Sequence, residues 1–241
     1  MNYSVPGYLF PYILSGNLVV VATVLFGLYR ALKRAGWPAE DRRQAFGSVK
    51  ALLVSWFFAA LLPSWFGFYG GKPSRIPTIQ YGLLIPIIAG VALFWLWPAL
   101  RRVIKAVPQE WMVGVQFYRT MGLIFLVLHA EGRAPGLFAW PAGVGDITVG
   151  LLAPLIGVAY ARRWHHAAGL VRVWNLLGIA DLIVAVTTGF LTSPSPVQMF
   201  AFDTPNQLIG IFPLVMIPVF LVPLSILLHL ASLWKLRRME I

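Results

Sequence analysis

The sequence predicts an all-α, polytopic membrane protein: a seven-transmembrane-helix bundle with its N-terminus outside and its C-terminus cytoplasmic. Of the 241 residues, 59% are hydrophobic and only 11% are charged, whereas water-soluble domains carry about 25% charged residues. Apolar stretches of about 20 residues, the length that crosses the hydrocarbon core of a bilayer, recur seven times. The basic residues are divided unequally between alternate connections, and this bias sets the orientation.

The seven apolar stretches leave no room for a separate soluble domain. Prolines mark several of their boundaries: Pro108 precedes the fourth stretch, Pro141 opens the fifth and Pro205 precedes the seventh. We also expect a short interfacial helix over 37–50 that runs into the second stretch. The predicted spans are approximately 8–30, 46–69, 80–100, 109–131, 142–161, 169–191 and 206–234.

Basic residues gather on one side of the predicted membrane. Fifteen of the 19 Lys and Arg residues lie in segments 30–50, 101–105 and 162–172 and at the C-terminus. The other side has three, namely Lys72, Arg75 and Arg133. Because basic residues favour the cytoplasmic side, this division predicts a multi-pass protein of the inner (cell) membrane of a bacterium-like cell.

The chain forms one integral membrane domain, 1–241, with two halves of different character. Residues 1–107 form three apolar scaffold helices, whereas 108–241 form helices 4–7 and contain almost all of the intramembrane ionisable groups. The net charge of +11 lies in short connections, which predicts contact with anionic lipid head groups of the bilayer and excludes a nucleic-acid partner. The absence of Cys excludes disulfides and thiolate chemistry.

Arg119 and Asp181 are charged residues at bilayer depth. Arg119 lies about ten residues into the fourth span and Asp181 about twelve into the sixth, or roughly 15 and 18 Å from the cytoplasmic side. An uncompensated charge at this depth costs at least about 2.5 kcal/mol. The matched depths therefore predict an ion pair between the two side chains, as a static fastener of the helices or as a ligand- or proton-handling pair.

Helical phase places these groups on inward faces. Gln116 and Arg119 share one sector of the fourth span, and Asn175 lies on the same span as Asp181. Asp146 and Asp181 each fall on a stripe of small residues, which lets helices approach closely in membranes. We therefore expect a polar seam between helices 4, 5 and 6.

A second polar group is predicted nearer the outside, from His129, Glu131 and Asp146. The connection between them is about ten residues, so the three side chains could meet at one depth and form the outer part of a ladder that leads to Arg119 and Asp181. Such ladders carry protons or solutes because His and carboxylates exchange protons near neutral pH. We predict no metal site, since side chains two apart on a helix point roughly 160° from each other.

No cofactor is predicted. Haem remains an alternative with a single His ligand or with a haem shared between subunits, because His129 and His229 lie near opposite ends of their spans and cannot bridge one haem. Ser225 and His229 share a face of the seventh span but have no assigned partner. Lys235 lies at the exit of this span, too far out for a retinal Schiff base.

The leading functional prediction is a membrane protein that binds or transports a small solute or protons through the polar seam, and we do not expect an enzyme. Two alternatives remain. The chain could be a non-catalytic accessory or assembly subunit, with a membrane-protein partner or a homo-oligomer as its complex. It could also be a haem- or metal-dependent membrane enzyme that uses His129 and the neighbouring carboxylates.

Overall fold

The computed structural model describes residues 4–70 and 75–239, and this part of the chain is helical with no strand. Seven helices are long and apolar enough to cross a membrane, as a multi-pass membrane protein requires. The helical segments are α1 (Leu9–Arg34), α2 (Ala39–Trp65), α3 (Ile79–Leu96), α4 (Pro98–Ala106), α5 (Gln109–Gly114), η1 (Val115–Gly122), α6 (Leu123–Ala130), α7 (Gly136–Ala161), α8 (Ala167–Thr192), η2 (Leu208–Gly210), η3 (Ile217–Leu221) and α9 (Val222–Met239).

Prolines explain where the observed helices differ from the expected ones. The third span ends at Trp97, whose extended backbone precedes Pro98, because a residue before proline avoids the α conformation. The fifth span begins at Gly136, so Pro141 lies inside α7 and does not open it. The seventh span begins at Ile217, because Pro205 and Pro213 interrupt the backbone hydrogen bonds before it. The predicted interfacial segment 37–50 is mostly part of α2, which is continuous.

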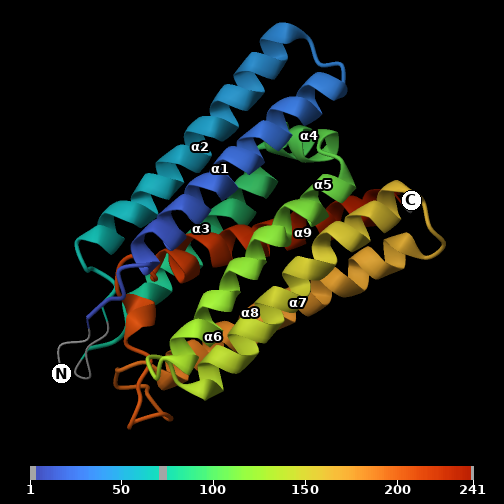
Figure 1. Cartoon of the computed structure of the whole chain (residues 1–241). Helices are drawn as coiled ribbons and strands as arrows, with labels where there is room; N and C mark the ends of the chain where they lie inside the picture. The colour runs from blue at the N-terminus through green and yellow to red at the C-terminus, as the bar shows by residue number, and fades with distance from the viewer. Residues whose placement is uncertain (1–3, 71–74, 240–241) are drawn as a thin grey trace.

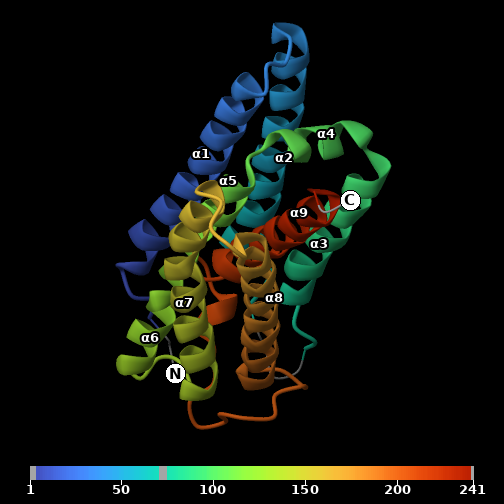
Figure 2. The same cartoon turned by 90° about the vertical axis from the view of Figure 1, so that its right-hand side faces the viewer.

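The helices form two groups (Figures 1 and 2). The antiparallel pair α1–α2 stands to one side, and α5, α6, α7 and α8 pack on the other. Helix α9 lies between them and packs against α3, α5 and α8. The fourth span is built from α5, η1 and α6 in succession, and α7 packs along all three of these segments.

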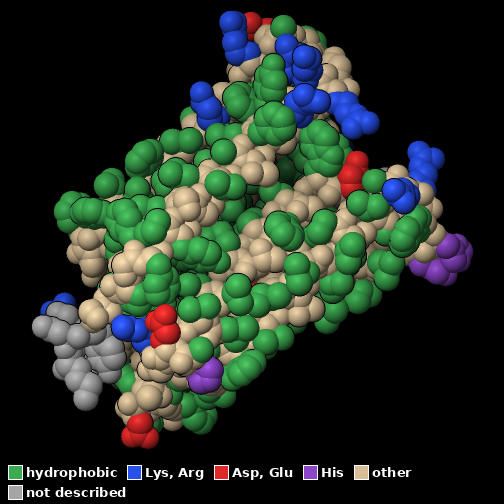
Figure 3. Space-filling view, in the orientation of Figure 1, with side chains coloured by type: hydrophobic (Ala, Val, Ile, Leu, Met, Phe, Trp, Pro, Cys, Tyr) green, Lys and Arg blue, Asp and Glu red, His purple; other side chains and the backbone are tan. Residues whose placement is uncertain are grey.

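The charges are separated along the long axis of the bundle. The α1–α2 connection, α4, the α7–α8 connection and the end of α9 carry the clustered basic residues, and we call this the basic end. Figure 3 shows Lys and Arg over the α1–α2 and α7–α8 connections, with hydrophobic side chains covering much of the surface between the ends. Large apolar residues such as Phe26, Ile88 and Leu155 are exposed there, as expected for a surface that faces acyl chains. Lys72, which the sequence places at the opposite end, lies outside the described residues.

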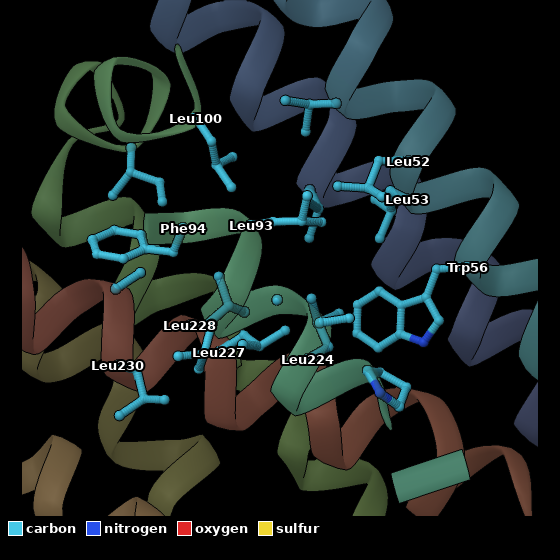
Figure 4. Close-up of a pocket in the computed structure, with 18 of the residues that line it drawn as sticks. Leu52, Leu53, Trp56, Leu93, Phe94, Leu100, Leu224, Leu227, Leu228 and Leu230 are labelled. Atoms are coloured by element: carbon cyan, nitrogen blue, oxygen red, sulfur yellow. The ribbon is translucent and has the colours of Figure 1, made fainter. Parts of the chain in front are cut away.

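An apolar groove of about 1490 Å³ separates the α1–α2 pair from α3, α4 and α9. Figure 4 shows Leu52 and Trp56 of α2 on one side of this groove, and Leu93, Leu224 and Leu227 on the other. Its lining is almost entirely hydrophobic, with Glu110 and Arg237 among the few charged residues. The groove therefore suits hydrocarbon and offers little to a polar ligand.

Candidate functional site

The middle of the fourth span departs from α-helical geometry. Segment η1 is a 3-10 helix of eight residues, whereas 3-10 runs longer than three or four residues are uncommon and often mark a hinge or a strained segment. Arg119 lies within it and is only 3% exposed. Segment η3, at the start of the seventh span, has π-helical hydrogen bonding, which is frequent at functional sites. Arg119 thus lies in one irregular segment, and residues of the other, Ile217 and Pro218, line the cavity described below.

Arg119 binds two carboxylates from two helices. Its Nε donates to Asp146 Oδ1 of α7 at 2.8 Å, and Nη2 lies 2.7 Å from the same oxygen. Nη2 also donates to Asp181 Oδ2 of α8, and Nη1 donates to the carbonyl of Gly178 at 3.1 Å. The structure therefore contains the predicted Arg119–Asp181 ion pair. It adds Asp146, which the sequence assigned to an outer group with His129 and Glu131.

The charges of this cluster do not balance when all three groups are ionised. One guanidinium carries a single positive charge, and the two carboxylates would carry two negative charges. A net charge buried at membrane depth is costly. A proton on one carboxylate, or a bound cation, removes this imbalance, so the cluster has the composition of a proton- or cation-binding site.

A buried hydrogen-bond chain extends from Arg119 toward the basic end. Because a guanidinium only donates, Arg119 Nη1 donates to His229 Nε2 at 3.3 Å, and His229 Nδ1 must then carry the proton that it donates to Asn175 Oδ1 at 2.9 Å. Asn175 Nδ2 donates to Ser232 Oγ at 2.8 Å, and Gln109 Nε2 donates to the same hydroxyl at 2.6 Å. These hydrogen bonds require a neutral His229 ring that is protonated at Nδ1.

Two glycines make room for the charged groups. A Cβ on Gly145 of α7 would lie 1.6 Å from Asp181 Oδ1, and a Cβ on Gly178 of α8 would lie 2.4 Å from the His229 ring. Real side chains do not approach so closely, so any larger residue at either position would displace the group that it faces. Gly178 belongs to the small-residue stripe expected on the sixth span, so this stripe serves the cluster as well as helix packing, whereas Gly145 was not singled out from the sequence.

A cavity of about 440 Å³ connects the cluster with the end opposite the basic one, and we call it the outer cavity. Its lining comes from the α2–α3 and α8–α9 connections and from α3, α6, α7, α8 and η3. Asp146 lines it at membrane depth. Both contacts from Arg119 go to Asp146 Oδ1, so within the described chain Oδ2 is the oxygen left for a ligand or a proton.

The predicted outer group does not form, and this part of the expectation was wrong. His129 Nδ1 lies 2.9 Å from the carbonyl of Ala134. Glu131 accepts a hydrogen bond from Tyr8 and pairs with Arg133. The helix ends at Ala130, so His129 and Glu131 bond to residues of the turn that follows and to Tyr8, whereas Asp146 lies deeper, against Arg119. The contact between Tyr8 and Glu131 also affects the tyrosine: burial and the hydrogen bond to Glu131 raise the pKa of Tyr8 to about 12.

Gln116 and Asn175, the two predicted amides, have different surroundings. Asn175 is a central member of the chain from His229 to Ser232. Gln116 is fully buried one turn before Arg119, and neither its Oε1 nor its Nε2 has a hydrogen-bond partner among the described residues. A buried amide without partners is costly, so Gln116 is available to bind water or a solute.

Sequence reasoning missed the contribution of the seventh span and of Gln109. Ser225, His229 and Ser232 are spaced four and three residues apart, so they lie on one face of α9, whose remaining residues before its basic end are apolar. Tyr118 bonds to Ser225 at 2.7 Å, and the other two belong to the chain described above. This face was a readable signal, because polar residues in a transmembrane helix usually face other helices.

The described residues contain no group of three or more metal-ligating side chains. Both ring nitrogens of His229 lie within hydrogen-bond distance of protein groups. His229 is therefore not a free ligand for a haem iron.

Comparisons with known proteins identify the family. No curated protein and no solved structure matches the chain. A family model described as "Domain of unknown function (DUF8737)" matches residues 76–237, about two thirds of the chain. The match includes α3 to α9 and therefore the whole Arg119 cluster, whereas α1 and α2 precede it. The chain thus belongs to the DUF8737 family.

Proposed function

We propose that this protein is a membrane transporter that binds a proton, and in exchange for it a small solute, at the cluster of Arg119, Asp146 and Asp181. The observation that carries the proposal is the charge imbalance at the closed end of the outer cavity. Two carboxylates share one guanidinium, and Asp146 lines the cavity by which a proton or solute would arrive. Intramembrane ionisable groups in this arrangement are typical of proton relays.

The roles of the side chains follow from their positions. Asp146 lines the cavity, so we assign the first exchange of the proton to this carboxylate, with Asp181 competing for the same guanidinium. The proton leaves as the solute arrives, or the reverse, because the cluster tolerates only one added positive charge. Arg119 holds both carboxylates in place and excludes a second proton.

Transport further requires access from the basic end. In the structure the side chains from His229 to Gln109 are buried and bonded to one another, and they close this side. We propose that two irregular segments bend to open it: η1, which contains Arg119, and η3, which lines the outer cavity. The positive-inside rule places the basic end in the cytoplasm, so the described state faces outward.

Orientation can be tested directly, because the native chain has no Cys. Single cysteines at Asp203, in the α8–α9 connection, and at Arg163, in the α7–α8 connection, lie in exposed positions at opposite ends. A membrane-impermeant maleimide applied to spheroplasts of a bacterial host should label Asp203→Cys, whereas Arg163→Cys should need permeabilised cells. The reverse pattern would contradict the orientation.

Proton binding is tested on protein reconstituted into vesicles with a trapped pH dye. After a pH jump, Asp146→Asn and Asp181→Asn should each lower proton uptake by about tenfold or more, while the exposed Asp203→Asn should behave as the native protein. Infrared difference spectra of the same samples should show a protonated carboxyl C=O band that is lost in Asp146→Asn. Native flux and an unchanged band in both cluster variants would leave Arg119 as a static fastener of the helices.

A further inference from the structure

We infer that the outer cavity binds a small organic cation, which takes the place of the exchangeable proton. This inference rests on the proposed function and names the class of solute. It is carried by three features of the cavity: its charge, the character of its walls and one buried amide without a partner.

The charge of the cavity selects for a cation. The cluster at its end would hold one uncompensated negative charge after the proton leaves, and Asp146, a member of this cluster, lines the cavity. A monocation restores neutrality, whereas an anion would add a second negative charge at membrane depth. A neutral solute would leave the imbalance unchanged. The site should therefore bind a solute with one positive charge more tightly than a neutral or negatively charged one.

The walls of the cavity select for an apolar body. Aromatic rings from three helices line it, from Phe125 of α6, Phe138 of α7 and Phe190 of α8. The rings of Phe125 and Phe138 pack edge to face, with centroids 5.0 Å apart. Aromatic faces attract ammonium groups by about 0.5–2 kcal/mol each, most strongly where water is excluded. A cation with a hydrocarbon body therefore fits better than a strongly hydrated metal ion.

A buried amide offers one further contact. Asn206 lines the cavity, is only 2% exposed, and its Nδ2 has no hydrogen-bond partner among the described residues. An unpaired buried donor costs roughly 1–3 kcal/mol, and a hydroxyl or carbonyl oxygen on the solute would satisfy it. The volume of about 440 Å³ lies at the small end of ligand pockets, which limits the solute to a single-ring or short-chain amine.

The exchange is balanced in charge and atoms. The cation enters from the outer end as Asp146 releases its proton to the water outside, and no bond in the solute is made or broken. Affinity for the cation should therefore fall as the pH is lowered, because protons and cations compete for one carboxylate.

The test uses benzyltrimethylammonium, which has a permanent charge and no proton of its own, with neopentylbenzene as its neutral isostere. Binding to the purified full chain is measured by calorimetry at two pH values. We expect the cation to bind at least about tenfold more tightly than the isostere, with release of a proton. Asp146→Asn should abolish this preference, while Asp203→Asn should retain it.

A second variant covers the case in which Asp146→Asn does not fold. Gly189 lines the cavity, and a Cβ there would meet Phe138 at 3.5 Å, an ordinary contact. Gly189→Leu should therefore fill the cavity without changing its charge, and should lose cation binding while keeping the protonated carboxyl band. Equal binding of the two isosteres, or cation binding that survives Gly189→Leu, would overturn the inference. If the carboxyl band itself is absent from the native protein, the proposed function fails as well.

Discussion

The apolar groove and the outer cavity lie on different sides of the seventh span, and their linings differ. The groove is the larger, at about 1490 Å³ against about 440 Å³, but it lies between mainly hydrocarbon side chains of the α1–α2 pair and of α3, α4 and α9. The outer cavity is small and ends at a carboxylate whose second oxygen is free of Arg119. Volume alone would select the groove as the site. Charge selects the cavity, because a bilayer already supplies ligands for hydrocarbon surfaces but none for a buried ion.

The largest expected effect concerns the contribution of the Arg119 cluster to the stability of the protein. Arg119→Gln leaves two buried carboxylates without their cation and should destabilise the protein by about 3–5 kcal/mol. Thermal unfolding in detergent measures this loss, and Arg163→Gln, at an exposed arginine of the basic end, is the matched control. The triple variant Arg119→Gln/Asp146→Asn/Asp181→Asn should recover much of the stability. If the triple variant stays as unstable as Arg119→Gln, the loss of stability comes from altered packing and not from the unpaired charges.

A smaller effect is expected from overpacking the cluster. Gly145→Ala places a methyl group where Asp181 Oδ1 lies, and the required shift should cost about 1–3 kcal/mol and weaken proton uptake. Gly169→Ala, on α8, is the control, because a Cβ there meets nothing within 4 Å. The two variants are compared by thermal unfolding and by the vesicle assay. Equal behaviour would mean that Asp181 does not need its present position.

The closed side of the cluster is expected to be more tolerant. Ser232→Ala removes the hydroxyl that accepts from Asn175 and Gln109 and should destabilise the fold by about 0.6–1.7 kcal/mol, the range for hydrogen bonds between membrane helices. Ser15→Ala is the control, because among the described residues Ser15 bonds only within its own helix. Hydrogen exchange at the basic end of α9 should become faster in Ser232→Ala alone. Unchanged exchange would show that the chain does not close this side.

The smallest effect is expected in the groove. Leu227→Ala enlarges it opposite Gly90, and should change benzyltrimethylammonium affinity by less than about twofold because lipid acyl chains refill the space. Phospholipids with photoreactive acyl chains should crosslink to groove residues such as Leu93, as read by peptide mass spectrometry. A loss of cation binding in Leu227→Ala would show that the apolar groove, and not only the outer cavity, contributes to binding of the cation.

Sequence reasoning went furthest where a membrane restricts the options. Seven spans follow from hydropathy, and the Arg119–Asp181 pair follows from depth, because a buried charge must find a partner. The contact of Asp146 with Arg119 did not follow. It depends on the axial position of α7 relative to the fourth span. Side-chain packing sets this position, and the periodicity of the sequence does not encode it. The partners of His229 were also missed. Its shared face with Ser225 is readable from the spacing, but the groups that this face meets on other helices depend on packing.

The buried chain from Arg119 to Gln109 has a consequence for leakage. Protons hop readily through water and carboxylates, but a guanidinium and two amides are poor carriers, and His229 is held with its only proton committed to Asn175. The part of the molecule between the cluster and the basic end should therefore not conduct protons in this conformation. Under the proposed function, an ion that crosses would have to wait for helices to move, so the transport rate should follow the temperature dependence of a conformational change and not that of an open water-filled pore.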